Sequence, residues 1–164
     1  MASATTTPAP LRSNVPSTRV LHAVNPIVSA ILRSPLHGIL SGSLLLLTFA
    51  GRKTGKAYTI PVGYTRDGET LLLFTDRAWR KNLRGAGGVP VTVRLQGHER
   101  SGRAELIEEP AAVMATVDRL TARYGPKATG RRVGLTLDAT TPPSHAQLAA
   151  ALEGHVLIAL TLEP

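Results

Sequence analysis

From Ser43 onward, short apolar runs separated by turn residues predict an antiparallel β structure. The apolar cluster 44–50 is long enough for a buried strand and too short to span a membrane. In 58–65 and 89–96, apolar and polar residues alternate with a period of two, which is typical of strands with one buried face. The six expected strands are 44–49, 58–65, 70–75, 89–95, 102–107 and 156–162.

Turn residues between these strands predict hairpin connections. Asp67-Gly68 is a strong hairpin signal, and 97–101 is expected to form another turn. Pro61 places its strand at a sheet edge or a bulge, because proline cannot donate to a central ladder.

Helical spacing marks the remaining segments. The expected helices are 19–40, interrupted at its two prolines, 77–84, 110–124 and 144–152. Met114, Val117, Leu120 and Tyr124 form one apolar stripe, which we assign to the core. Residues 127–143 show no regular pattern and are expected to be irregular.

These elements predict a flexible tail (1–18) followed by one domain (19–164) that begins with the amphipathic helix 19–40. The connections are hairpins, without a repeating βαβ pattern. We therefore expect a mainly β (α+β) fold, a closed or partly closed antiparallel barrel with peripheral helices.

The net charge of +8 indicates an anionic partner, because no acidic residue precedes Asp67. Nucleic acid, anionic lipid, and a phosphorylated or carboxylated small molecule all fit this charge, and so does a merely arginine-rich composition. The acid-free helix 19–40 suits either a membrane surface or the end of a barrel. No secretory signal is recognised at the amino terminus, so we expect a cytoplasmic protein, with the inner face of the cell membrane as an alternative.

The residue inventory excludes several chemistries. The chain has no cysteine, which rules out disulfides and thiol catalysis, and its five histidines are scattered, so no metal site is expected. There is no G-x-S-x-G motif and no convincing acid–base pair, and no catalytic residue is assigned. An enzyme with this inventory would rely on a cofactor.

The segment Gly51-Arg52-Lys53-Thr54-Gly55-Lys56 is the first candidate site. Two glycines allow a tight turn with exposed N–H groups, and three cations lie within five positions, which suits a phosphate. A plain polar hairpin turn has the same composition.

Trp79 and Asn82 are the second candidate site. On a helix they share a face, where a planar ring beside a carboxamide could position a flavin-like ring system. A tryptophan that plugs the barrel and an asparagine that caps a turn would account for the same residues.

Together these motifs resemble the deazaflavin (F420)-dependent nitroreductase family. The resemblance is carried by Leu-Leu-Leu-Thr-Phe-Ala-Gly-Arg-Lys-Thr-Gly (45–55), Ile60-Pro61-Val62, the Asp67-Gly68 hairpin and Trp79-Arg80-Lys81-Asn82-Leu83. It implies a split β-barrel that binds coenzyme F420, with its phosphate and glutamyl tail. It further implies hydride transfer to a quinone, nitroaromatic or enone-like acceptor.

The resemblance also implies site residues. Arg52, Lys53, Thr54 and Gly55 would hold the anionic tail, and Trp79 and Asn82 would line the ring and substrate pocket. Tyr58 replaces an arginine common in the family, and Lys56 would compensate for it. We place Tyr58 and Tyr64 beside Trp79 in the substrate pocket. The segment before Trp79 is shorter than in the family, which leaves FMN as an alternative cofactor.

Two other functions fit the sequence. One is a non-catalytic carrier or sensor of a flavin, deazaflavin or haem, which would bind its ligand without reducing an acceptor. The other is nucleic-acid binding, which the scarcity of aromatic residues argues against. The sequence does not fix the oligomeric state, and a homodimer is one option.

Overall fold

The computed structural model describes residues 12–13, 30, 42–136 and 143–164. Apart from three residues, the expected tail 1–18 and helix 19–40 lie outside these ranges, and the proposed membrane contact stays a prediction. Arg12–Ser13 (β1) pairs with Leu135–Thr136 (β8), and Ala30 is helical and exposed. Within the described ranges, no helix has the length and apolar character that crossing a bilayer requires.

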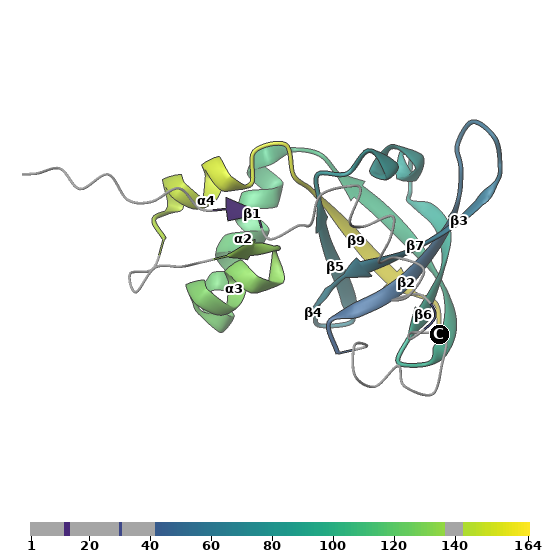
Figure 1. The fold of residues 1–164 in the computed structure, drawn as a ribbon, viewed down its shortest axis with the longest axis horizontal. Coiled ribbons are helices and arrows are strands. Elements are labelled where there is room, and N and C mark those ends of the chain that lie inside the picture. Colours follow the sequence, from purple (N-terminus) through teal and green to yellow (C-terminus); the bar gives the residue numbers. More distant parts are fainter. Residues whose placement is uncertain (1–11, 14–29, 31–41, 137–142) are drawn as a thin grey trace, which may run out of the picture.

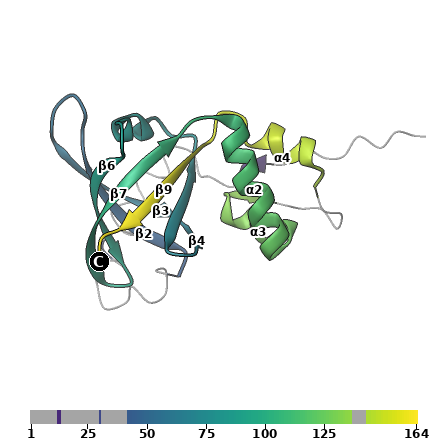
Figure 2. The same cartoon turned by 180° about the vertical axis from the view of Figure 1, so that it is seen from behind.

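Seven antiparallel strands form the main sheet, in the order β3-β2-β6-β7-β9-β5-β4 (Figures 1 and 2). They are Leu44–Ala50 (β2), Ala57–Gly63 (β3), Thr65–Asp67 (β4), Thr70–Thr75 (β5), Val89–Leu95 (β6), His98–Ile107 (β7) and Val156–Leu162 (β9). The mainly β fold class is confirmed. The count is seven rather than six because the expected strand 58–65 bends at Tyr64 and continues as β4.

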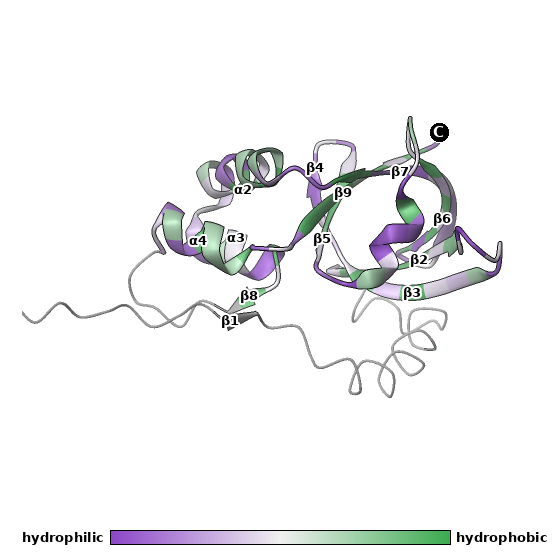
Figure 3. Ribbon diagram, turned by 90° about the horizontal axis from the view of Figure 1, so that it is seen from above, coloured by the Kyte–Doolittle hydropathy of each residue, from purple (hydrophilic) through white to green (hydrophobic). Residues whose placement is uncertain are grey.

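That bend connects the two edges of the open, curled sheet. β3 and β4 are the two outer strands of the sheet, yet only Tyr64 separates them along the chain. The Tyr64 N–H donates to the Ser43 carbonyl at 3.1 Å, which holds the bend against the start of β2. The sheet curls around its apolar interior (Figure 3). Pro61 lies on the edge strand β3, as predicted.

The barrel interior is filled by alternate apolar residues of the strands. Leu45, Leu47 and Phe49 point inward from β2 and are at most 3% exposed. β5 is buried on both faces: Leu71 and Leu73 lie in the interior, whereas Leu72 belongs to a separate cluster beneath the helices. Burial on both faces explains why the sequence of this strand is a nearly continuous run of apolar residues.

Helices form a layer beside the barrel (Figures 1 and 2). They are Pro110–Tyr124 (α2), Pro126–Arg132 (α3) and His145–Ala151 (α4). α2 and α4 agree with the expected segments, and Ser144 caps α4 in a capping box with Gln147. The expectation of irregular structure for 127–143 is wrong for its first part, because α3 starts on a proline, which favours the first turn of a helix. Val133 then packs into the helical cluster.

Two local expectations also need correction. The turn predicted at 97–101 is shorter: β7 begins at His98, and only Gln96 and Gly97 form the turn, with φ of 50° and 82°. The short helix expected at 77–84 is a 3₁₀-helix, Ala78–Leu83 (η2), rather than an α-helix.

Candidate functional site

The hairpin loop between β2 and β3, residues 51–56, closes on itself. The Gly51 N–H donates to the Lys56 carbonyl at 2.8 Å, and the Gly55 N–H donates to the Gly51 carbonyl at 2.7 Å. The side chains of Arg52, Lys53 and Lys56 are exposed. In the described part of the chain, the N–H groups of Lys53 and Thr54 have no hydrogen-bond acceptor. The loop therefore combines free backbone donors with three cations, which is the donor set of an anion site.

Aromatic rings join this loop to the barrel interior. The Phe49 ring stacks with Tyr58, at a centroid distance of 6.0 Å, and with Trp79, at 5.7 Å. A Cβ atom on Gly51 would lie 2.8 Å from Cε2 of Tyr58, so a larger residue at this position would displace the exposed Tyr58 ring. Phe49 contributes its ring to this aromatic stack, although its residue type and position did not mark it as a site residue in the sequence. Its place in the expected strand 44–49 had assigned it to the core.

Asn82 links the loop to η2. Its Oδ1 accepts a hydrogen bond from the Arg52 N–H at 3.1 Å, and its Nδ2 donates to the Trp79 carbonyl at 3.0 Å. In a 3₁₀-helix residues three apart are aligned, which places Asn82 directly over Trp79. The carboxamide thus fixes the cationic loop and the tryptophan relative to each other.

A cavity of about 390 Å³ opens beside Trp79, within the size range of small-molecule sites. We call it the apolar cavity, after the residues Ile60, Pro61, Val62, Leu73, Trp79 and Val133 that line it. Charged residues border it as well: Asp76, Arg77, Arg131 and Arg132. His155 also lines the cavity, and its buried Nδ1 has no hydrogen-bond partner among the described residues.

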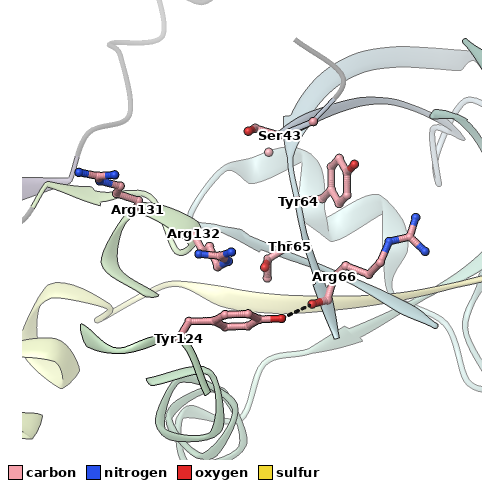
Figure 4. A pocket seen from close by; sticks show the side chains of 9 residues that line it. Ser43, Tyr64, Thr65, Arg66, Tyr124, Arg131 and Arg132 are labelled. Carbon is pink, nitrogen blue, oxygen red and sulfur yellow. Dashed lines mark hydrogen bonds between the residues drawn. The ribbon is translucent and has the colours of Figure 1, made fainter. Parts of the chain in front are cut away.

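A second cavity of about 470 Å³ adjoins the first, since Gly63, Arg131 and Arg132 line both. We call it the cationic cavity; its other lining residues include Tyr64, Thr65, Arg66 and Tyr124 (Figure 4). Burial raises the pKa of the Tyr64 phenol, and the nearby Arg66 charge lowers it by less. The phenol therefore stays protonated at neutral pH.

The structure brings most of the predicted site residues together. The loop residues Arg52–Lys56 lie in one turn, Asn82 and Trp79 are joined to that turn, and Tyr58 lies in the aromatic stack. Tyr64 is apart from them, at the cationic cavity. Arg131 and Arg132 were missed because they lie in the segment expected to be irregular. Pro126, just before that segment, was the signal that could have found their helix.

Residues 32–141, more than half of the chain, match the family model of the F420H2-dependent quinone reductases. The chain belongs to this family. The resemblance noted from the sequence is therefore confirmed, and the protein is an F420-dependent reductase. Among curated proteins, no sequence matches it significantly.

Solved structures similar to the reductase share little sequence with it. One named F420 reductase is 17% identical, covers 83% of this chain and 93% of its own, and has a TM-score of 0.44. An F420H2-dependent reductase is 14% identical, with coverages of 71% and 93% and a TM-score of 0.40. An FAD- and haem-binding protein from Mycobacterium smegmatis is 20% identical, with coverages of 80% and 67% and a TM-score of 0.43. Similarity at this level carries no argument about ligands.

The described residues fit the coenzyme of the family. F420 has an anionic tail, for which the loop 51–56 provides cations and free N–H groups. Its planar ring system needs an apolar wall, which the apolar cavity has. FMN is not needed to account for the family match.

Proposed function

We propose that this reductase transfers a hydride from reduced F420 to a small quinone, nitroaromatic or enone-like acceptor. In this proposal the loop 51–56 holds the coenzyme tail and the apolar cavity receives the reacting ring and the acceptor. The observation that carries the proposal is the pair of Asn82 hydrogen bonds, which holds the anion-binding loop and the cavity wall as one unit.

The loop would act through charge and backbone donors. Arg52 and Lys53 are exposed, with no resolved partner in the described part of the chain, so their cationic groups are available to a phosphate or carboxylate. The N–H groups of Lys53 and Thr54 add two donors that need no side-chain ordering. Lys56 adds a third cation close to the position of Tyr58.

The apolar cavity would position the ring and exclude water. Trp79 is half-buried and packs on Phe49, so its ring forms a fixed wall of the cavity. Ile60, Pro61 and Val62 border the same space from β3. Reduced F420, when bound, supplies a hydride, and a quinone that accepts this hydride and one proton becomes a hydroquinone.

Titration of the protein with F420, followed by coenzyme fluorescence, tests the proposal, with FMN as the competing ligand. In the variant Arg52→Gln/Lys53→Gln, the loss of two charge-assisted contacts should weaken F420 binding by about tenfold or more, equal to about 1.4 kcal/mol. The loss should shrink at high salt, where the wild-type charges are screened.

The matched control is Arg94→Gln/Arg100→Gln, which removes the same charge from β6 and β7. Unchanged F420 affinity in the loop variant would refute the assignment of the loop. Bound F420 that reduces none of the three acceptor classes would instead support a carrier.

A further inference from the structure

His155 lies where the turn after α4 leads into β9. Its backbone N–H donates to the Leu152 carbonyl at 2.9 Å, and the next residue, Val156, pairs with Thr75 of β5. The imidazole is half-buried and lines the apolar cavity, as Trp79 of η2 does. The end of the helix and the start of the strand therefore fix the backbone that carries this ring.

Neither ring nitrogen of His155 has a hydrogen-bond partner in the part of the chain that the structure describes. Nδ1 is buried, which leaves Nε2 as the accessible nitrogen. Buried polar groups in proteins are nearly always paired. An unpaired imidazole at the wall of a cavity therefore points to a functional use of the ring.

The burial of Nδ1 indicates where the ring carries its proton. A neutral imidazole has a proton on one nitrogen and a lone pair on the other. A proton on Nδ1 would be a buried donor without an acceptor, whereas a proton on Nε2 can be shared with water or a ligand. His155 is therefore a hydrogen-bond donor through Nε2.

The polar groups that neighbour His155 along this wall are engaged with one another. The Thr75 hydroxyl accepts a hydrogen bond from the Arg77 N–H at 3.1 Å, and the Asp76 carboxylate lies 3.4 Å from Nε of Arg77. All three residues line the cavity together with His155. No described neighbour takes up the Nε2–H, which is left for a ligand in the cavity.

We propose that Nε2–H of His155 donates a hydrogen bond to a carbonyl oxygen of the quinone acceptor. This proposal rests on the proposed function, which places the acceptor in the apolar cavity and supplies the hydride. A quinone that accepts a hydride gains two electrons, and negative charge develops on its oxygen. Solvent then supplies one proton, which completes the hydroquinone, and His155 keeps its own proton.

Such a hydrogen bond would accelerate the reaction. It is stronger to an oxygen that is becoming negative than to the neutral carbonyl, so it stabilises the transition state more than the bound quinone. The imidazole acts here through its N–H dipole, from a position that the backbone at the start of β9 fixes.

Substitutions at His155 separate the donor from the ring. The assay is single-turnover oxidation of bound F420H2 by duroquinone. His155→Phe keeps a planar ring without a donor and should lower the rate by about a hundredfold or more, as the loss of one oxyanion donor does. His155→Gln keeps an N–H donor and should lose much less. The matched control is His98→Phe, at an exposed histidine of β7, which should keep the wild-type rate. F420 affinity should be unchanged in all three variants, because the loop 51–56 is intact.

Two results would overturn the proposal. One is a wild-type rate in His155→Phe. The other is an equal loss in His155→Phe and His155→Gln, which would assign the effect to packing of the ring rather than to its donor.

If the wild type oxidises no F420H2, the proposed function fails, and the coenzyme-free protein still tests the contact. Trp79 is the only tryptophan and lines the same cavity, so quenching of its fluorescence reports binding of duroquinone there. Bound duroquinone should shift the nitrogen NMR resonance of His155 Nε2, which is identified by its absence in His155→Phe. Quenching without this shift, or no quenching at all, refutes the contact.

Discussion

The variant Asn82→Ala tests how the site is held together. It removes the carboxamide that accepts from the Arg52 N–H at 3.1 Å and donates to the Trp79 carbonyl at 3.0 Å. The alanine side chain reaches neither group, and alanine remains compatible with the helical turn. The loop 51–56 keeps its own hydrogen bonds between Gly51, Gly55 and Lys56, so its internal shape should persist. What changes is its position relative to Trp79.

The size of the effect follows from the two hydrogen bonds. Each is a neutral bond of a half-buried side chain and contributes about 1 kcal/mol, so the free energy of unfolding should fall by about 2 kcal/mol. Only the bond to Arg52 restrains the loop. If its contribution of about 1 kcal/mol favours the loop position that binds the coenzyme, its loss should weaken F420 binding about fivefold.

Urea denaturation measures the stability, and fluorescence titration with F420 measures the affinity. Lys81→Ala, an exposed neighbour on the same 3₁₀-helix, is the control and should change stability little. Asn82→Asp keeps an oxygen for the Arg52 N–H and loses the donor to Trp79, so it separates the two bonds. F420 affinity within twofold of wild type, in an Asn82→Ala variant that is measurably destabilised, would refute the positioning role.

Two further predictions concern stability. Gly102→Ala should lower the free energy of unfolding by about 1–3 kcal/mol in urea denaturation, because its Cβ would lie 2.6 Å from the backbone oxygen of Thr161 between β7 and β9. The control is Gly42→Ala, which places no atom within 4 Å of the new Cβ. Equal stability of the two variants would contradict the clash. The hydrogen bond from Arg84 lowers the pKa of Glu108. This ion pair should therefore stabilise the protein at any pH above the usual pKa of a carboxyl group, and that contribution should be lost as the pH falls through the lowered pKa of Glu108. Melting curves of wild type and Glu108→Gln should therefore differ at neutral pH and converge in acid, and a constant difference would exclude the pair as its cause.

The strands were predictable from the sequence because burial of one or both faces leaves a regular apolar pattern. The first half of β7 escaped prediction because His98, Glu99, Arg100 and Ser101 are all exposed, and a strand with two exposed faces has no alternation to detect. α3 escaped for a related reason: its buried positions are Thr129 and Gly130, which are small and contribute no apolar periodicity.

The candidate site was predictable in its parts and not in its connections. Glycines and cations in one turn indicate an anion site from local chemistry alone. The role of Asn82 depends on a contact across 30 residues of sequence, which no local pattern reports. Tyr64 was grouped with Tyr58 because alternation along one straight strand puts them on the same face. The bend between β3 and β4 carries Tyr64 to the cationic cavity instead.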